Sequence, residues 1–150
     1  MSLFSQIMDI VYTETIREQE GGTYGVGTSA SISSYNNEWM FLFGFDTNVE
    51  KCIYLKERAQ EELMKVVNGG VREEDFNKVK EYMIKEYAND QRENNYWSGV
   101  LTSHVLGNNI ETGYLRALET ISMDELNLFI STLFLDNENV VEQIMTGETK

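Results

Sequence analysis

The spacing of apolar residues changes from that of a helix to that of a strand at one pair of glycines, Gly21 and Gly22. Before this pair, residues 4–19 repeat apolar side chains every three or four positions, which predicts a helix with one buried face. After it, residues 24–32 alternate between larger and smaller side chains, which predicts a β-strand. Glycine readily adopts the left-handed conformation found at helix ends. The chain is therefore expected to turn there directly from a helix into a sheet.

The expected strand has two unequal faces. Its larger side chains share one face: Tyr24, Val26, Thr28, Ala30 and Ile32. The other face carries only glycine and serine, which predicts the close approach of another backbone or element. Residues 39–45 then form a dense aromatic and aliphatic run, which predicts a second strand buried on both faces. A polar turn separates the two runs, so we expect an antiparallel hairpin.

Helical patterns dominate the rest of the chain. Polar residues 46–48 offer N-caps to a helix that is expected to end at residues 68–70, Asn-Gly-Gly. A further helix begins with the acidic residues 73–75, breaks near residues 89–95 and gives way to another that ends near 107–109. Two short helices are expected at about 111–120 and 123–134, the second opened by a capping box between Ser122 and Glu125. A turn at 136–139 and a final strand at 140–145 follow.

This order of elements predicts the fold class. It fits an α+β domain whose mostly antiparallel sheet carries its helices on one face, and 150 residues suffice for a single domain, 1–150. The net charge of −13 argues against a nucleic-acid-binding protein, because neutralising phosphates requires clustered Lys and Arg. No apolar run reaches the roughly 18 residues of a membrane-spanning helix, so no membrane span is expected.

Few residues could support metal or thiol chemistry. The chain has one cysteine and one histidine, which excludes an intrachain disulfide and leaves a zinc site short of ligands. We interpret Cys52 as a buried apolar residue, and His104 as a core or boundary residue of its helix. The acidic clusters at 61–62 and 73–75 are interpreted as solvated helix faces and ends. The glycine-rich residues 21–27 lack the lysine of a phosphate-binding loop and lead from helix into strand, the reverse of the nucleotide-binding order.

Arg17 and Tyr24 flank the Gly-Gly turn and can come together in space, because the turn folds the strand against the helix. Two interpretations are open. In the structural one, Arg17 solvates the end of its helix and Tyr24 plugs an edge of the sheet. In the functional one, a guanidinium and a phenol converge on one point, where their donors could bind a carbonyl or an oxyanion.

The segment 17–26, Arg-Glu-Gln-Glu-Gly-Gly-Thr-Tyr-Gly-Val, resembles a pattern in the C-terminal half of the pitrilysin/insulinase family of zinc metallopeptidases. In that family Leu-Arg-Glu-Lys-x-Gly-x-x-Tyr stands at the end of a helix. The likeness covers nearly the whole chain. It continues through the Phe-rich second strand, the Gly-Gly helix end, the Glu-Glu-Asp-Phe-Asn-Lys-Val-Lys helix start, Asn-Asn-Tyr-Trp at 94–97, Ile-Ser-Met-Asp-Glu-Leu at 121–126 and a closing strand at 139–141.

The resemblance implies a clamshell of two similar halves. One half carries an inverted zinc motif, His-x-x-Glu-His, and the other contributes an arginine and a tyrosine that bind the substrate carbonyl near the zinc-bound water. This chain has no His-x-x-Glu-His and so resembles the non-zinc half. By resemblance, Arg17 and Tyr24 are the catalytic residues it would contribute. No cofactor or metal is expected in this chain, and zinc is expected in an N-terminal half or a partner subunit.

Two departures from the family pattern carry expectations of their own. The strands and helix that precede the Arg-bearing helix in the family are missing, so we expect a partial domain that lacks its first strands. Uncovered strands should then cause the chain to self-associate. Arg72 stands where a serine or threonine normally caps the acidic helix, so that end is expected to be frayed or capped in another way.

The function expected from the resemblance is the substrate-binding C-terminal part of a zinc-dependent endopeptidase that acts on peptides. The alternative is a catalytically inactive scaffold or binding module of the same fold. The bacterial periplasm and the cytoplasm are both compatible with the sequence.

Overall fold

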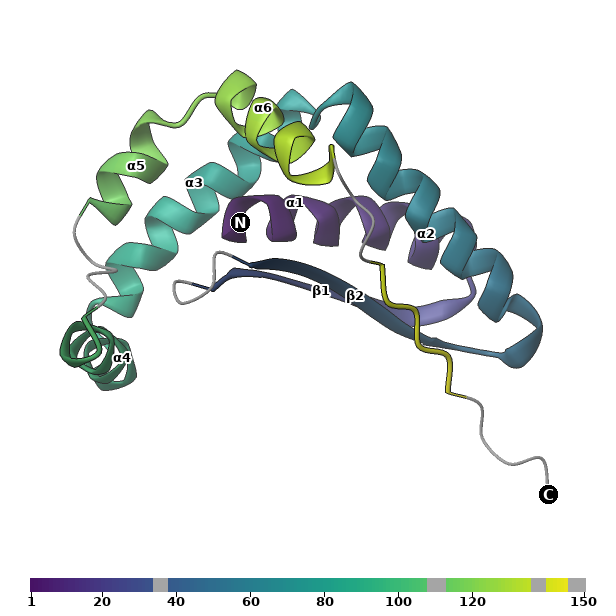
Figure 1. Cartoon of the computed structure of the whole chain (residues 1–150), viewed down its shortest axis with the longest axis horizontal. Coiled ribbons are helices and arrows are strands. Elements are labelled where there is room, and N and C mark those ends of the chain that lie inside the picture. The colour runs from purple at the N-terminus through teal and green to yellow at the C-terminus, as the bar shows by residue number, and fades with distance from the viewer. Residues whose placement is uncertain (34–37, 108–112, 136–139, 146–150) are drawn as a thin grey trace.

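The computed structural model describes residues 1–33, 38–107, 113–135 and 140–145. Helix α1 (Ser2–Tyr12) continues into a π-helical segment, η1 (Thr13–Gln19), and leads to strands β1 (Thr23–Ile32) and β2 (Trp39–Thr47). Five helices follow in the described ranges: α2 (Val49–Gly69), α3 (Glu73–Asp90), α4 (Asn94–Val105), α5 (Tyr114–Thr120) and α6 (Met123–Phe134). Figure 1 shows most of these helices above a single sheet, with α4 at one end of the molecule.

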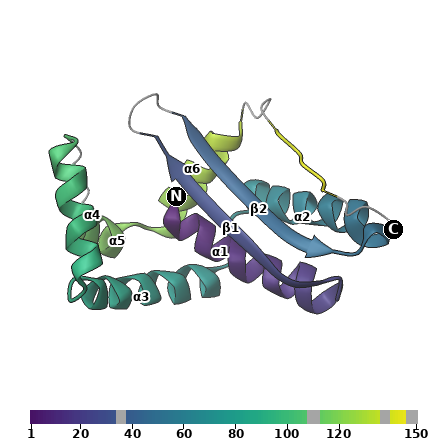
Figure 2. The ribbon, with the colours of Figure 1, turned by 90° about the horizontal axis from the view of Figure 1, so that it is seen from below.

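The architecture is a layer of helices on one face of a two-stranded antiparallel sheet. This confirms the predicted α+β class and the predicted hairpin. Helix α1 lies directly against the sheet, α2, α3 and α6 surround it, and α4 stands at one end of the molecule (Figures 1 and 2). The opposite face of the sheet carries no helix among the residues described.

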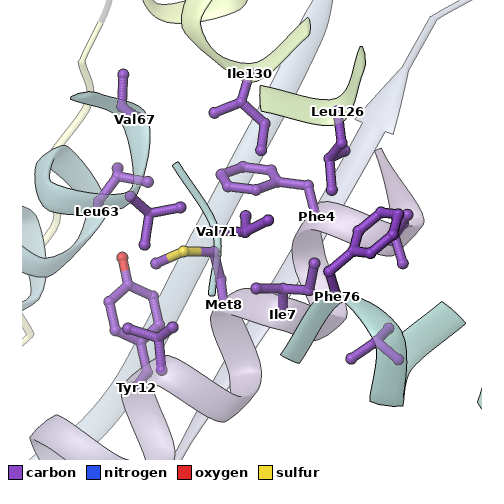
Figure 3. Close-up of a cluster of buried hydrophobic side chains, with 14 of the residues drawn as sticks. Phe4, Ile7, Met8, Tyr12, Leu63, Val67, Val71, Phe76, Leu126 and Ile130 are labelled. Atoms are coloured by element: carbon purple, nitrogen blue, oxygen red, sulfur yellow. The ribbon is translucent and has the colours of Figure 1, made fainter. Parts of the chain in front are cut away.

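The core forms where α1 meets the other helices and the sheet. Phe4, Ile7, Met8 and Tyr12 of α1 are fully buried. Around them lie side chains of α2, α3 and α6, among them Leu63, Phe76, Leu126 and Ile130 (Figure 3). Full burial of one large apolar side chain stabilises a fold by about 1.5–3 kcal/mol, so the buried residues of α1 contribute strongly to the free energy of folding.

Strand β2 is buried on one face only, so the predicted burial of both faces is wrong. Phe41 and Phe43 point to the helices, where their rings lie 4.9 Å from Phe4 and 5.2 Å from Tyr12, centroid to centroid. Met40 and Leu42 point the other way and are 54% and 57% exposed. One helical layer covers only one side of a two-stranded sheet, and a continuous apolar run cannot reveal which side that is.

The glycine–serine face of β1 also differs from its prediction. A Cβ built on Gly25, Gly27 or Gly44 would have no described atom within 4 Å outside its own chain neighbours. The expected close approach of another element is therefore not found in the described part of the chain. Small residues here leave an open surface on the helix-free side of the sheet.

Helix α2 is shifted in face relative to the sequence pattern. Asn48 caps it, with its Oδ1 accepting a 2.8 Å hydrogen bond from the Lys51 amide, and Gly70 with φ +82° follows its end, as predicted. The apolar spacing of the sequence predicts a buried stripe without Leu55: Val49, Cys52, Ile53, Ala59, Leu63, Val66 and Val67. In the structure Leu55 is fully buried, whereas Val49 and Ile53 are more than half exposed. Contacts with α1, η1 and α6 select the buried side of α2, and a single-helix pattern does not specify those neighbours.

The later helices follow the prediction more closely. α3 ends at Asp90 and α4 begins at Asn94, which confirms the predicted break. Ser122 and Glu125 form the predicted capping box. In contrast, α4 buries none of its described residues, and His104 is exposed, so its interpretation as a core or boundary residue is wrong. α4 lies at the end of the molecule, where only one side of it meets other helices.

Residues 140–145 form no strand, which corrects the predicted closing strand. They run beside α2, where the Glu142 carboxylate accepts hydrogen bonds from Lys56 Nζ at 2.9 Å and Gln60 Nε2 at 2.5 Å. Val141 is 93% exposed. An apolar segment forms a strand only when a neighbouring strand accepts and donates its backbone hydrogen bonds, and the described residues place none beside this segment. Residues 34–37 of the turn predicted at 33–38, the turn predicted at 136–139, and residues 108 and 109 of the helix end predicted near 107–109 lie outside the described residues.

Candidate functional site

Arg17 and Tyr24 stand on either side of the turn that joins η1 to β1. Arg17 is exposed in η1, and Gly21 takes the left-handed conformation with φ +59°. This turn was predicted from the Gly-Gly pair. The π-helical winding of residues 13–19 was not, because wide helical turns leave no clear signal in apolar spacing. Such segments occur frequently at functional sites.

A bulge at the start of β1 sets the position of Tyr24. Thr23 pairs with Thr47 and Val26 with Phe45, so β1 has one extra residue between the two pairs. The Thr23 hydroxyl stabilises this bulge by donating to the Gly25 carbonyl at 2.9 Å and accepting from the Gly25 amide at 3.2 Å. The alternating pattern of the sequence predicted that Tyr24 and Val26 share a face of the strand. The extra residue breaks this alternation, and Tyr24 is 98% exposed.

Tyr24 borders a shallow, open hollow of about 480 Å³. The walls are residues 21–24 from the turn and residues 46–48 from the end of β2 and the cap of α2. A 2.6 Å hydrogen bond from Thr47 Oγ1 to the Gly22 carbonyl joins the two walls. A Cβ at Gly22 would lie 2.5 Å from Leu55 Cδ1, so any larger residue there would require the Leu55 side chain to shift.

Three side chains of α2 hold the turn through Glu20. Its carbonyl accepts from Lys51 Nζ at 3.1 Å, and its carboxylate accepts from the Tyr54 hydroxyl at 2.9 Å and pairs with Arg58 Nε at 3.4 Å. The hydrogen bond to Glu20 raises the pKa of Tyr54. Sequence reasoning missed these residues, since more than 30 positions separate them from Glu20 and no motif links them.

The side chains of Arg17 and Tyr24 have no hydrogen bond or ion pair with any residue in the described ranges. By contrast, Arg58 of α2, which also lies near this turn, pairs with Glu20, Glu61 and Glu62. A ring that is 98% exposed plugs no sheet edge in the described part of the chain, so the structural interpretation of Tyr24 does not hold there. Both side chains face solvent near the same turn, and no hydrogen bond joins one to the other.

Arg72 links the start of α3 to η1. Its Nη2 lies 2.8 Å from Glu14 Oε2, and its Nε donates to Asp75 Oδ2. Arg72 makes no side-chain cap hydrogen bond to the start of α3, because a guanidinium has no acceptor for its backbone amides. Its ion pairs instead tie this uncapped helix end to Asp75 and to the segment that carries Arg17. Asp75 is 4% exposed, so the acidic cluster 73–75 is not wholly solvated as interpreted.

Glu62 corrects the interpretation of the other acidic cluster. It is 7% exposed and lies 2.7 Å from Arg58 Nη1 and 2.7 Å from Lys65 Nζ. Two cations therefore compensate a buried carboxylate that sequence alone placed on a solvated face. Burial of an acidic residue needs such pairing.

The described residues contain no group of three or more His, Cys, Asp and Glu side chains that could hold a metal ion. His104 is exposed, and Cys52 is a free, half-buried thiol. Within the same ranges, no helix combines the length and the apolar character needed to cross a membrane.

Comparison with known protein families shows which family this chain resembles. A model described as the peptidase M16 inactive domain matches residues 1–83, more than half of the chain and all of α1, the hairpin and the Gly-Gly turn. The chain belongs to the peptidase M16 family. This confirms the resemblance to the C-terminal, non-zinc domain of the pitrilysin/insulinase peptidases. No curated protein matches the chain.

Two solved structures share the fold of this M16 domain. The periplasmic protease PqqL from Escherichia coli superposes with a TM-score of 0.74 at 18% identity, over 86% of this chain and 15% of the PqqL chain. A conserved protein from Enterococcus faecalis V583 superposes with a TM-score of 0.66 at 14% identity, over 87% of this chain and 31% of that chain. The M16 domain therefore spans less than a third of the length of either structure.

Proposed function

We propose that this M16 domain is the substrate-binding part of a zinc-dependent endopeptidase, in which Arg17 and Tyr24 bind the carbonyl of the peptide to be cleaved. The observation that carries the proposal is the exposure of Tyr24, 98%. A tyrosine ring is commonly at least partly buried, and one that packs on no described residue is free to contact a ligand. Arg17 is also exposed and unpaired within the described ranges, in a chain with 25 acidic residues.

The chemistry needs two kinds of donor. A guanidinium presents a planar set of N–H groups, and a phenol presents one O–H, so together they can hold a carbonyl oxygen that gains negative charge during attack. The anchoring of Glu20 by α2 supports this role, because donors act on a transition state only when the backbone that carries them is held in place.

The attacking water must come from elsewhere. We propose that a zinc-bearing half, on the same polypeptide or on a partner subunit, supplies the metal-activated water. The short share of PqqL that this chain covers is compatible with a larger assembly. This chain would contribute the side chains that bind and orient the peptide.

The test uses the complete enzyme with its His-x-x-Glu-His half. Tyr24→Phe should lower kcat by about 10²–10³ with a smaller change in KM, because the phenol donor acts mainly in the transition state. Arg17→Lys should also lower kcat, since an ammonium does not reproduce the planar donor. Arg116→Lys, an exposed arginine in α5, serves as the matched control. Wild-type kinetics for both site variants would overturn the assignment.

The second candidate is a catalytically inactive scaffold or binding module. It is favoured by the description of the matching family domain as inactive. In that case the complete protein would not cleave peptides, whatever its partner half. Metal analysis and peptide hydrolysis by the complete protein distinguish the two candidates: bound zinc with chelator-sensitive cleavage supports the peptidase, and their absence supports the scaffold.

A further inference from the structure

A second hollow, of about 370 Å³, is lined by α3, α4 and α5 and by Gln6 of α1. Helices α3, α4 and α5 meet at the end of the molecule away from the start of β1 (Figure 1). Four tyrosines line the hollow, half of the eight in the chain: Tyr82, Tyr87, Tyr96 and Tyr114. They come from three helices, so folding gathers them from distant positions. We call this hollow the tyrosine pocket.

The rings of the tyrosine pocket are arranged around Tyr87. Tyr96 meets it edge to face, with the centroids 6.2 Å apart and the planes at 87°. Tyr114 lies 5.4 Å from it at 35°. Because the planes differ in direction, the rings present both faces and edges to the hollow. Faces of aromatic rings carry negative electrostatic potential and attract cations that lie over them.

Two carboxylates reinforce this potential. Glu86 and Asp90 line the same hollow, and no Lys, Arg or His is among its described lining residues. Glu86 accepts a 3.3 Å hydrogen bond from Asn89, a neutral donor, and Asp90 has no ion pair with a described residue. Burial and the nearby Asp90 charge raise the pKa of Tyr114, so its phenol stays neutral. The pocket thus has negative charge and aromatic faces, and its described lining residues include no cation to balance that charge.

We propose that the tyrosine pocket binds the cationic side chain of an arginine or lysine residue in a peptide. The aliphatic stem of such a side chain packs on the rings, and its charged end reaches Glu86 and Asp90. The volume lies within the range of natural ligand sites, and an anion or an uncharged apolar group would leave both carboxylates without a counter-charge. This inference is independent of the proposed peptidase role, because Arg17 and Tyr24 belong to η1 and the start of β1, at the other end of the molecule (Figure 1).

The test is an NMR titration of the chain with Nα-acetyl-arginine methylamide and with its neutral isostere, Nα-acetyl-citrulline methylamide. The arginine compound should bind at least tenfold more tightly and shift the ring signals of Tyr82, Tyr87 and Tyr114. Citrulline keeps the shape and loses the charge, so equal binding of both compounds would overturn the proposal. The chain carries a net charge of −13, and shifts spread over its whole acidic surface would also overturn it.

Two variants test the pocket itself. Tyr82→Leu, at a ring that is 53% exposed, should weaken binding about two- to fivefold, the usual contribution of one exposed cation–π contact. Asp90→Asn should weaken arginine binding and leave citrulline binding unchanged. Glu81→Gln, an exposed position on α3 outside the pocket, removes the same charge and should leave the affinity unchanged. If Glu81→Gln weakens binding as much as Asp90→Asn, the attraction is general and the proposal fails. Amide spectra that match the wild type show that each variant is folded.

Discussion

The Asp9 carboxylate of α1 accepts a 3.0 Å hydrogen bond from the backbone amide of Thr28 in β1. The Thr28 hydroxyl also donates to the Ser5 carbonyl at 2.9 Å. Since the amide of Thr28 is engaged by a helix, it points away from β2, and α1 occupies this part of the outer edge of β1. Along an antiparallel ladder, pairs that exchange backbone hydrogen bonds alternate with pairs whose backbone groups point outward. Thr28 and Phe43 form a pair of the second kind, so the amide of Phe43 points to the outer edge of β2. That edge has no strand partner within the described chain.

The open edge and open face of β2 predict self-association of the isolated chain at micromolar concentration. Pairing is expected at β2, because Asp9 blocks β1 and because exposed Met40 and Leu42 extend the apolar surface beside the edge. Leu42→Lys should shift the chain toward monomer in sedimentation experiments. Leu128→Lys, at a 69% exposed leucine on α6, changes the charge equally and should leave association intact. A wild-type chain that stays monomeric, with slow amide exchange along both strands, would show that the sheet protects itself.

The isolated chain is expected to bind no catalytic zinc and to cleave no peptide. The reason is the ligand count: one histidine, one cysteine and no metal-binding group among the described residues. Equilibrium dialysis with zinc and a peptide hydrolysis assay measure both properties. Stoichiometric zinc that is lost in His104→Ala, together with chelator-sensitive hydrolysis, would contradict the assignment to the non-zinc domain.

Tyr12→Phe is expected to leave stability unchanged or to raise it. The Tyr12 hydroxyl is fully buried, has no hydrogen-bond partner within the described structure and points toward Leu63 of α2 (Figure 3). Burial, with the nearby Glu62 charge, raises the pKa of this phenol. Removing an unsatisfied buried group recovers up to about 1–3 kcal/mol in the free energy of unfolding. Tyr54→Phe, which loses the hydrogen bond to Glu20, should instead destabilise. A destabilised Tyr12→Phe would reveal a buried water bonded to the hydroxyl.

The capping box of α6 predicts a dependence of stability on pH. Hydrogen bonds from the amide and hydroxyl of Ser122 lower the pKa of Glu125 in the folded chain. A group whose pKa is lowered by folding stabilises the fold above its ordinary pKa, about 4.3, and this contribution is lost as the pH falls through the folded value. Urea denaturation between pH 3 and 7 should therefore show a smaller loss on acidification for Glu125→Gln than for the wild type. Equal slopes would mean that the box does not form in solution.

Local interactions in the sequence were enough to predict much of this fold. The helix before Gly21, the hairpin after it, the cap at Asn48, the break before Asn94 and the box at Ser122 all depend on residues within a few positions of one another. Chemical preferences act strongly over that range, because a cap or a turn residue meets its partner through the same stretch of backbone. The family resemblance likewise depended on short ordered motifs.

The tertiary structure decided which of several possible faces each element buries. Leu55 became core and Val49 did not, β2 buried one face instead of two, and residues 140–145 formed no strand. Tyr24 left the face predicted by alternation because one extra residue entered β1. These outcomes depend on neighbours that are distant in sequence, such as α1 over the sheet or Arg72 beside Glu14. An amphipathic pattern specifies that one face of an element will be buried, and only the packing of the whole chain specifies which neighbouring element covers that face.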